Sequence, residues 1–333
     1  MCHLERHIRN EFIYSTITHY LKGDFVQNLI FIGDVHGRSD KLLPFIQRYG
    51  CGDTQFVFVG DLIDNALNEE TDHLTTLNMI HQLCEQSRAV CIMGNHELNA
   101  IGWSLQKNDG SYCRPRNKLG NLKQHQCFLA AVGSDSAEHQ RWIEWFKRLP
   151  IFVEYDHARA IHACWNQQAI DQIGPYLNSD NSLKDQFWYQ AFDEQHELYH
   201  LLETLLKGPE LALPKGYSFL DKTGIERAQV RVAWWKGEAE GLSYADIALL
   251  PEEARSQLPQ QLIPVTVQRM CAKPEKLTVI GHYTLPVTRA PQTIGQNVVC
   301  VDFNAAKGSN PLVGYKLDVS NQLGTFVISR YSF

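Results

Sequence analysis

Short apolar blocks alternate with segments of helical spacing in the first third of the chain. Apolar runs at 29–32, 56–59 and 89–93 predict buried strands, and the residues between them predict a helix that begins at Ser39 and another over 71–85. Strands that alternate with helices in this way are typical of parallel pairing with right-handed crossovers. Because ligands gather at the carboxyl ends of such strands, we expect the residues that follow each strand to lie close together.

The middle of the chain breaks this pattern. Apolar spacing first predicts a helix over 137–149 and a pair of strands at 151–153 and 159–163. Residues 166–274 are then richer in Gln, Glu and Leu, with helical stretches around 185–206. We interpret this segment as an inserted, mainly helical cap region.

The strand pattern resumes near the C-terminus. One apolar run at 276–280 predicts a further buried strand. Three more runs predict consecutive strands of a second sheet: 298–301, 312–317 and 325–331. Together these elements predict a fold of the α/β (α+β) class, with residues 1–333 forming one domain into which the cap is inserted.

Short polar motifs follow the predicted strands. There are five: GDVHG at 33–37, GDLIDN at 60–65, GNHE at 94–97, IHAC at 161–164 and GHY at 281–283. They supply carboxylate oxygens, an amide oxygen and imidazoles, which is the ligand set that two neighbouring divalent cations need. The sequence therefore predicts a dinuclear metal hydrolase that acts on phosphate esters.

The residue types in these motifs suggest individual ligands. Asp34 and His36 stand two positions apart, so in an extended segment both side chains would reach one ion. Asp61 has two carboxylate oxygens and could bridge two ions. The expected ligands are Asp34, His36, Asp61, Asn95, His162 and His282. Water held between two such ions loses a proton near neutral pH and becomes a nucleophile.

Two residues beside these ligands are candidates for acid catalysis. His96 directly follows Asn95 and could donate a proton to the leaving oxygen. Asp64 could accept a hydrogen bond from His96 and fix its tautomer. Each motif taken alone has a plainer interpretation, since Gly-Asp after a strand is usually a turn and His162 alone could be a core histidine. The occurrence of all five in order favours the metal site.

The five motifs resemble those of a known family. The order of the five motifs is similar to that in the calcineurin-like metallophosphoesterases, and closest to the branch with phosphoprotein phosphatases and bacterial symmetrical dinucleoside tetraphosphatases. The resemblance covers about 30–165 and 276–330. It implies a central β-sandwich with helices on both outer faces. It also implies that Asp34 and His36 bind the first metal, that Asp61 bridges, that Asn95, His162 and His282 bind the second, and that His96 and Asp64 form the acid pair.

The sequence departs from this branch in one place and from the wider family in another. The branch usually has Asp-Arg after the bridging loop, and that arginine binds phosphate, whereas this chain has Asp64 followed by the neutral Asn65. Thr284 stands where many members of the wider family carry a last metal-binding histidine, as expected for this branch. Three cations could replace the missing arginine: Arg38, Arg231 and Lys236.

Composition limits the remaining choices. A net charge of −6 argues against stable nucleic-acid binding, and no run of about 18 apolar residues predicts a membrane segment. Nine cysteines without CxxC pairs suggest reduced thiols, so we expect a cytoplasmic protein. The ligands would accept manganese, iron, zinc or nickel. Three functions remain open. The protein could be a phosphatase of a phosphorylated protein or small molecule, a dinucleoside polyphosphate hydrolase, or a non-catalytic metal-binding scaffold.

Overall fold

Two β-sheets form the centre of the protein. The computed structural model describes residues 28–64, 71–220, 224–236, 241–265, 267, 274–287 and 291–329. The first sheet has the order β13-β12-β1-β2-β3. Its strands are β1 (Asn28–Ile32), β2 (Thr54–Phe58), β3 (Ala89–Cys91), β12 (Val313–Asp318) and β13 (Leu323–Ile328). As expected, β1, β2 and β3 pair in parallel, while β12 and β13 add in antiparallel orientation.

The second sheet has the order β11-β10-β5-β4. Its strands are β4 (Phe152–Glu154), β5 (Ala158–Ile161), β10 (Leu277–Ile280) and β11 (Val298–Cys300). The expectation that the last three strands form one sheet is wrong, because β11 pairs with β10 whereas β12 pairs with β1. Apolar runs mark a strand as buried, but they carry no information about which sheet it joins.

Alternating side chains of β1 explain the layers. Leu29 and Phe31 pack in a cluster that also contains Val279 of β10, so the two sheets share an apolar interior. Ile30 and Ile32 point the other way and belong to a larger cluster that includes residues of the helices. This is the period-two pattern of a strand that is covered on both faces.

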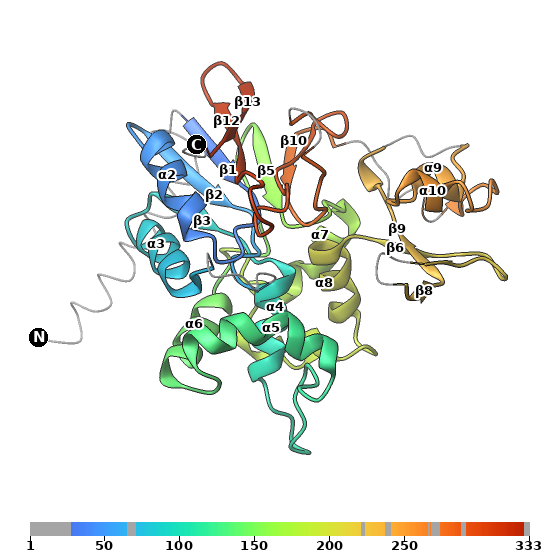
Figure 1. The fold of residues 1–333 in the computed structure, drawn as a ribbon, viewed down its shortest axis with the longest axis horizontal. Coiled ribbons are helices and arrows are strands. Elements are labelled where there is room, and N and C mark those ends of the chain that lie inside the picture. The colour runs from blue at the N-terminus through green and yellow to red at the C-terminus, as the bar shows by residue number, and fades with distance from the viewer. Residues whose placement is uncertain are drawn as a thin grey trace, which may run out of the picture.

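Helices cover the first sheet and extend below it (Figure 1). In chain order these are α2 (Ser39–Tyr49), α3 (His73–Glu85), α4 (Asn95–Ser104), α5 (Leu119–Val132) and α6 (Ala137–Phe146). Among the described residues, no helix is both long and apolar enough to cross a bilayer.

In the described part of the segment from 166 to 274, the helices longer than four residues lie only in the first part. It begins with α7 (Gln167–Ile173), three short 3-10 turns and α8 (Glu197–Lys207). Two strand pairs follow, β6 (Glu210–Ala212) with β9 (Gln229–Arg231) and β7 (Phe219–Leu220) with β8 (Glu226–Arg227). The segment then contains the 3-10 turn η4 (Trp234–Lys236) and the short helices α9 (Tyr244–Ile247) and α10 (Glu252–Arg255). These strands hold only two or three residues, too few for a period of two to be recognised.

Candidate active site

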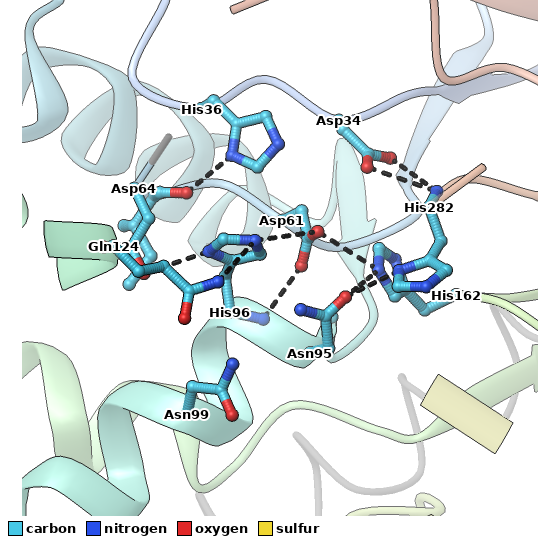
Figure 2. Close-up of polar contacts among 12 residues, drawn as sticks. Asp34, His36, Asp61, Asp64, Asn95, His96, Asn99, Gln124, His162 and His282 are labelled. Atoms are coloured by element: carbon cyan, nitrogen blue, oxygen red, sulfur yellow. Dashed lines mark hydrogen bonds and ion pairs between the residues drawn. The ribbon is translucent and has the colours of Figure 1, made fainter. Parts of the chain in front are cut away.

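The six expected metal ligands follow the carboxyl ends of five strands, five of them in loops and Asn95 as the first residue of α4. Asp34 and His36 follow β1, Asp61 follows β2, Asn95 follows β3, and the two remaining histidines follow β5 and β10. Figure 2 shows Asp61 in the middle of the cluster. The parallel strands β1, β2 and β3 end at one edge of their sheet, which brings together residues that are far apart in the chain.

Asp61 is shared by two groups of potential ligands. The first contains His36, Asp61 and His96, and the second contains Asp61, His162 and His282, with ligand atoms within 4.8 Å of one another in each group. Asp34 is not a member of either group. It lies beside them, where its two carboxylate oxygens accept the backbone N–H of His282 at 3.3 and 3.2 Å.

The histidine tautomers suit metal binding. His36 Nδ1 lies 2.6 Å from the carbonyl oxygen of Ile63, and His162 Nδ1 lies 2.6 Å from that of Val59. Because a carbonyl oxygen only accepts, each Nδ1 must donate, which leaves the lone pair on Nε2 in a neutral ring. Nε2 of His282 is buried and has no hydrogen-bond partner among the described residues.

Acceptor atoms face one another around the second group. His162 Nε2 lies 3.1 Å from Asn95 Oδ1 and 3.2 Å from Asp61 Oδ2. When His162 is neutral these three atoms all carry lone pairs, and a cation between them would satisfy all three. His282 Nδ1 lies 2.7 Å from the same Asn95 oxygen.

The charges of the cluster also fit cations. Burial, together with the carboxylates of Asp302 and Asp61, raises the pKa of Asp34 well above its usual range. Burial alone would raise the pKa of Asp61 too, but His162 and His96 outweigh it and hold this pKa well below its usual range. Buried carboxylates that repel one another gain strongly from a bound cation. The residues present therefore fit two divalent ions.

Several site residues adopt left-handed backbone conformations. The φ angles are positive for His36 at 47°, Asp61 at 53°, Asp64 at 69° and His282 at 67°. The chain turns at His36 and Gly37, so the extended geometry expected from Asp34 to His36 does not hold at His36. Such conformations are costly for residues with side chains and persist where the surrounding structure holds them.

Glu97 is one of the residues that hold these turns. Its carboxylate is fully buried and accepts the backbone N–H groups of Asp61 at 2.9 Å, Leu62 at 2.8 Å and Gly94 at 3.0 Å. Sequence reasoning did not assign this role to Glu97. The residue lies in the first turn of α4, where it accepts the N–H of Gly94, but the motif GNHE does not reveal its contact with the bridging loop.

His96 and Asp64 are joined as expected. His96 Nδ1 lies 3.0 Å from Asp64 Oδ2, and Nε2 lies 3.7 Å from Asp61 Oδ2. Burial would lower the pKa of His96, yet the carboxylates of Asp61 and Asp64 raise it to about 9. The second oxygen of Asp64 accepts from Nδ1 of His125 at 2.9 Å. His125 lies inside α5 and no local motif marks it, so sequence reasoning missed it.

With this geometry established, comparison with known proteins identifies the family. The sequence profile of the calcineurin-like phosphoesterases matches residues 28–236. The chain belongs to this family. It is therefore a metal-dependent hydrolase that acts on phosphate esters. No curated protein sequence matches the chain.

Solved structures similar to this phosphoesterase cover almost the whole chain at low identity. One, provisionally described as a diadenosine tetraphosphatase, has 13% identity and a TM-score of 0.44, and the alignment covers 93% of this chain and 96% of that one. A serine/threonine phosphatase from Saccharomyces cerevisiae, with similarity to human phosphatase PP5, has 11% identity, a TM-score of 0.45 and coverages of 93% and 82%. A metallophosphoesterase from Sphaerobacter thermophilus has 11% identity, a TM-score of 0.42 and coverages of 92% and 89%.

Arg38 of this phosphoesterase is bound within the fold. Its side chain is 1% exposed, and its guanidinium pairs with both oxygens of Asp40 at 2.8 and 2.7 Å. It also donates to backbone carbonyls of the loop that leads into β12: those of Ala305, Ala306 and Gly308. These contacts favour a structural role for Arg38 over the expected phosphate-binding role.

The other candidates for substrate binding differ in their surroundings. Arg231, at the end of β9, has a buried Nε with no hydrogen-bond partner among the described residues. Burial, and then the positive charge of Arg231, lowers the pKa of His282, so Arg231 lies near the second ligand group. Lys236 donates to the carbonyl oxygen of Asp246. Asn65 lies outside the described residues.

Proposed function

We propose that this protein is a phosphohydrolase with a dinuclear metal centre that cleaves phosphomonoesters of a protein or a small molecule. The observation that carries the proposal is the shared position of Asp61 between two groups of potential ligands, the first of which contains His96, the partner of Asp64. A centre of two divalent ions would activate water and neutralise the phosphate. Six side chains would hold it: Asp34, His36, Asp61, Asn95, His162 and His282.

The chain's own residues supply proton transfer to the leaving group. We assign this step to His96, because its Nε2 faces the shared carboxylate of Asp61 at 3.7 Å and its Nδ1 is held by Asp64. A pKa of about 9 keeps His96 protonated at neutral pH, so Nε2 has a proton to donate to the leaving oxygen. Asp64 keeps the ring in one orientation and stabilises its charge.

Arg231 is the candidate that we propose for the phosphoryl group itself. Its charge acts on His282, and its Nε is buried without a described partner. A guanidinium suits phosphate because it can donate two parallel hydrogen bonds. This assignment places a cation near His282. The arginine that the related branch usually carries would stand at position 65, where this chain has Asn65.

A non-catalytic scaffold is disfavoured by the completeness of the site. A protein that kept the fold and lost the chemistry should lack ligands or the acid, whereas all six ligands, His96 and Asp64 are present. A dinucleoside polyphosphate remains an alternative substrate, because its hydrolysis needs the same groups.

Substitution of Asp61 tests the proposal most directly. The assay measures bound metal and hydrolysis of p-nitrophenyl phosphate with added manganese. We expect Asp61→Asn to lose metal and to cause the largest fall in turnover of any single substitution, because it weakens the only carboxylate shared by both groups. Near-normal metal content and turnover in this variant would reject the dinuclear assignment, and an inactive wild-type protein that still binds two metals would favour the scaffold.

A further inference from the structure

An arginine linked to the proposed acid is held by neutral partners. Arg114 lies between α4 and α5, and its backbone N–H donates to the carbonyl oxygen of Gly102 in α4 at 2.9 Å. Its Nη1 donates to Asn99 Oδ1 at 2.7 Å, and its Nη2 donates to Gln124 Oε1 at 2.5 Å. The guanidinium is thus fixed by one amide from each of two helices.

The charge of Arg114 has no close counter-charge. Among the residues that the structure describes, no carboxylate lies within 4.0 Å of its guanidinium, although Asp64 and Glu203 act on it from further away. Amide oxygens accept hydrogen bonds without supplying negative charge, and a half-buried cation without a counter-ion is costly. Two of its five N–H groups are used in these amide contacts, so others remain to meet an anion.

The neighbouring Arg116 shows the ordinary arrangement. It pairs with both oxygens of Asp135 at 2.8 and 2.7 Å. Its guanidinium also lies 3.5 Å above the ring centre of Tyr112. The two arginines of this loop thus differ in their counter-charge, because a carboxylate neutralises Arg116 whereas amide oxygens hold Arg114.

Gln124 connects Arg114 to the proposed acid. Its Oε1 accepts from Arg114, so its Nε2 can only donate, and this nitrogen lies 3.3 Å from Nε2 of His96. Gln124 can therefore donate to His96 Nε2 only when that nitrogen carries no proton, as it would after proton transfer to the leaving oxygen. Figure 2 shows Gln124 beside His96, with Asn99 on the side away from His36. Nε2 of His96 is the atom that we assign to protonate the leaving oxygen, so Gln124 links Arg114 to the side of the site on which the leaving group would depart.

We propose that Asn99, Arg114 and Gln124 form a subsite for a second phosphate, carried by the leaving group of the substrate. The proposal rests on the function proposed above, since it takes its direction from His96 as the acid. In this arrangement Arg231 binds the transferred phosphoryl group and Arg114 binds the group that departs. A leaving group without an anion would leave Arg114 without its counter-charge.

A comparison of two substrates tests this subsite. Pyrophosphate and p-nitrophenyl phosphate release leaving groups of similar acidity, but only pyrophosphate releases a phosphate. In Arg114→Ala, the ratio of kcat/KM for pyrophosphate to kcat/KM for p-nitrophenyl phosphate should fall roughly 10–150-fold, the value of a charge-assisted hydrogen bond of about 1.5–3 kcal/mol. Arg114→Lys, which keeps the charge, should recover part of the ratio.

Arg116→Ala is the matched control. It removes a guanidinium from the same loop, so it should lower the melting temperature while the substrate ratio stays at the wild-type value. A purely structural Arg114 would lower both values of kcat/KM together, and an unchanged ratio in Arg114→Ala would therefore reject the subsite. If Arg114→Ala does not fold, the same ratio is measured in Arg114→Gln, and an unchanged ratio in that variant would also reject the subsite.

A binding measurement separates this proposal from the proposed function. Calorimetry with the manganese-loaded protein compares imidodiphosphate, which resists hydrolysis, with inorganic phosphate. Arg114→Ala should weaken imidodiphosphate binding about tenfold or more relative to phosphate binding. If the wild-type protein hydrolyses neither substrate but shows this difference, the hydrolase assignment fails and the subsite stands. If it hydrolyses both and the difference is absent, the subsite fails alone.

Discussion

At the scale of single residues, substitution of His96 separates a loss of acid catalysis from a loss of bound metal. We expect His96→Asn to retain its metals, because the six proposed ligands remain. Turnover of alkyl phosphates should fall about 10²–10⁴-fold, the usual contribution of a positioned acid. The loss should be smaller for p-nitrophenyl phosphate, whose leaving group needs little protonation. Steady-state kinetics with both esters measures this, and equal losses would show that His96 is not the acid.

The three candidate phosphate-binding cations can be ranked by their own substitutions. Arg231→Ala should lower kcat/KM roughly 10–150-fold with metal content unchanged, since it would remove a charged hydrogen bond to the phosphoryl group. Lys236→Ala should have a smaller effect. Arg38→Ala should chiefly lower the melting temperature, because Arg38 binds the loop that leads into β12. A kinetic loss in Arg38→Ala greater than that in Arg231→Ala would contradict this order.

The candidate metal ligands could be found from the sequence because each lies in a short motif directly after a strand. Residues that lie outside these motifs could not be found in this way. His125 meets Asp64 from the middle of a helix 61 positions further along the chain, and helical spacing alone does not distinguish it. Arg38 is the opposite case. Its position directly after a ligand motif suggested a phosphate-binding role, which the burial of its side chain does not support.

At the scale of elements, the loops after β2 and β3 are packed so closely that a glycine is required. A Cβ on Gly94 would lie 2.3 Å from both the backbone nitrogen and Oδ1 of Asp61. Gly94→Ala should therefore displace the bridging residue, with loss of metal and a destabilisation of about 1–3 kcal/mol. Melting curves and metal analysis measure both effects.

Gly120 provides the comparison for Gly94. It lies in α5, and a Cβ there would meet nothing within 4 Å. Gly120→Ala should stabilise the protein by up to about 1 kcal/mol and leave the metals in place, because alanine favours helix. A similar metal loss in both variants would mean that the contact with Asp61 is not the cause.

The elements themselves were predictable where the pattern was long. The strands β1 and β2 and the helices α2 and α3 follow from runs of apolar residues and their spacing. The sheet to which β12 belongs did not follow, because its pairing with β1 joins residues from opposite ends of the chain. The strands between 210 and 231 were too short to show a period.

At the scale of the whole molecule, buried neutral histidines should make stability depend on pH. Burial lowers the pKa of His73 and of His139 to about 4, whereas an unfolded chain would have about 6.5. The unfolded state therefore binds protons first as the pH falls, so the free energy of unfolding should decrease between pH 6.5 and 4. His73 contributes about 1.6 kcal/mol of this loss between pH 6.5 and 5, and His139 contributes a smaller loss of the same sign.

Urea unfolding at pH 6.5 and 5 checks this expectation. His139→Asn keeps an acceptor for the backbone N–H of Asp135, which His139 Nδ1 now accepts at 3.1 Å, but it has no ionisable group. The variant should lose less stability than the wild type over this interval. An identical loss in both proteins would show that His139 does not take part.

The pairing of Asn28 with Asp318 also sets an order of events during synthesis. β1 leaves the ribosome before the candidate ligand His282 and before its partner β12. At about 5–20 residues per second, β1 and the loop after it wait roughly 15–60 s for β12. During this interval the nascent chain carries an open sheet edge and a half-assembled cluster of acidic and imidazole groups. Selection of metal at the proposed centre is thus postponed until His282 has emerged.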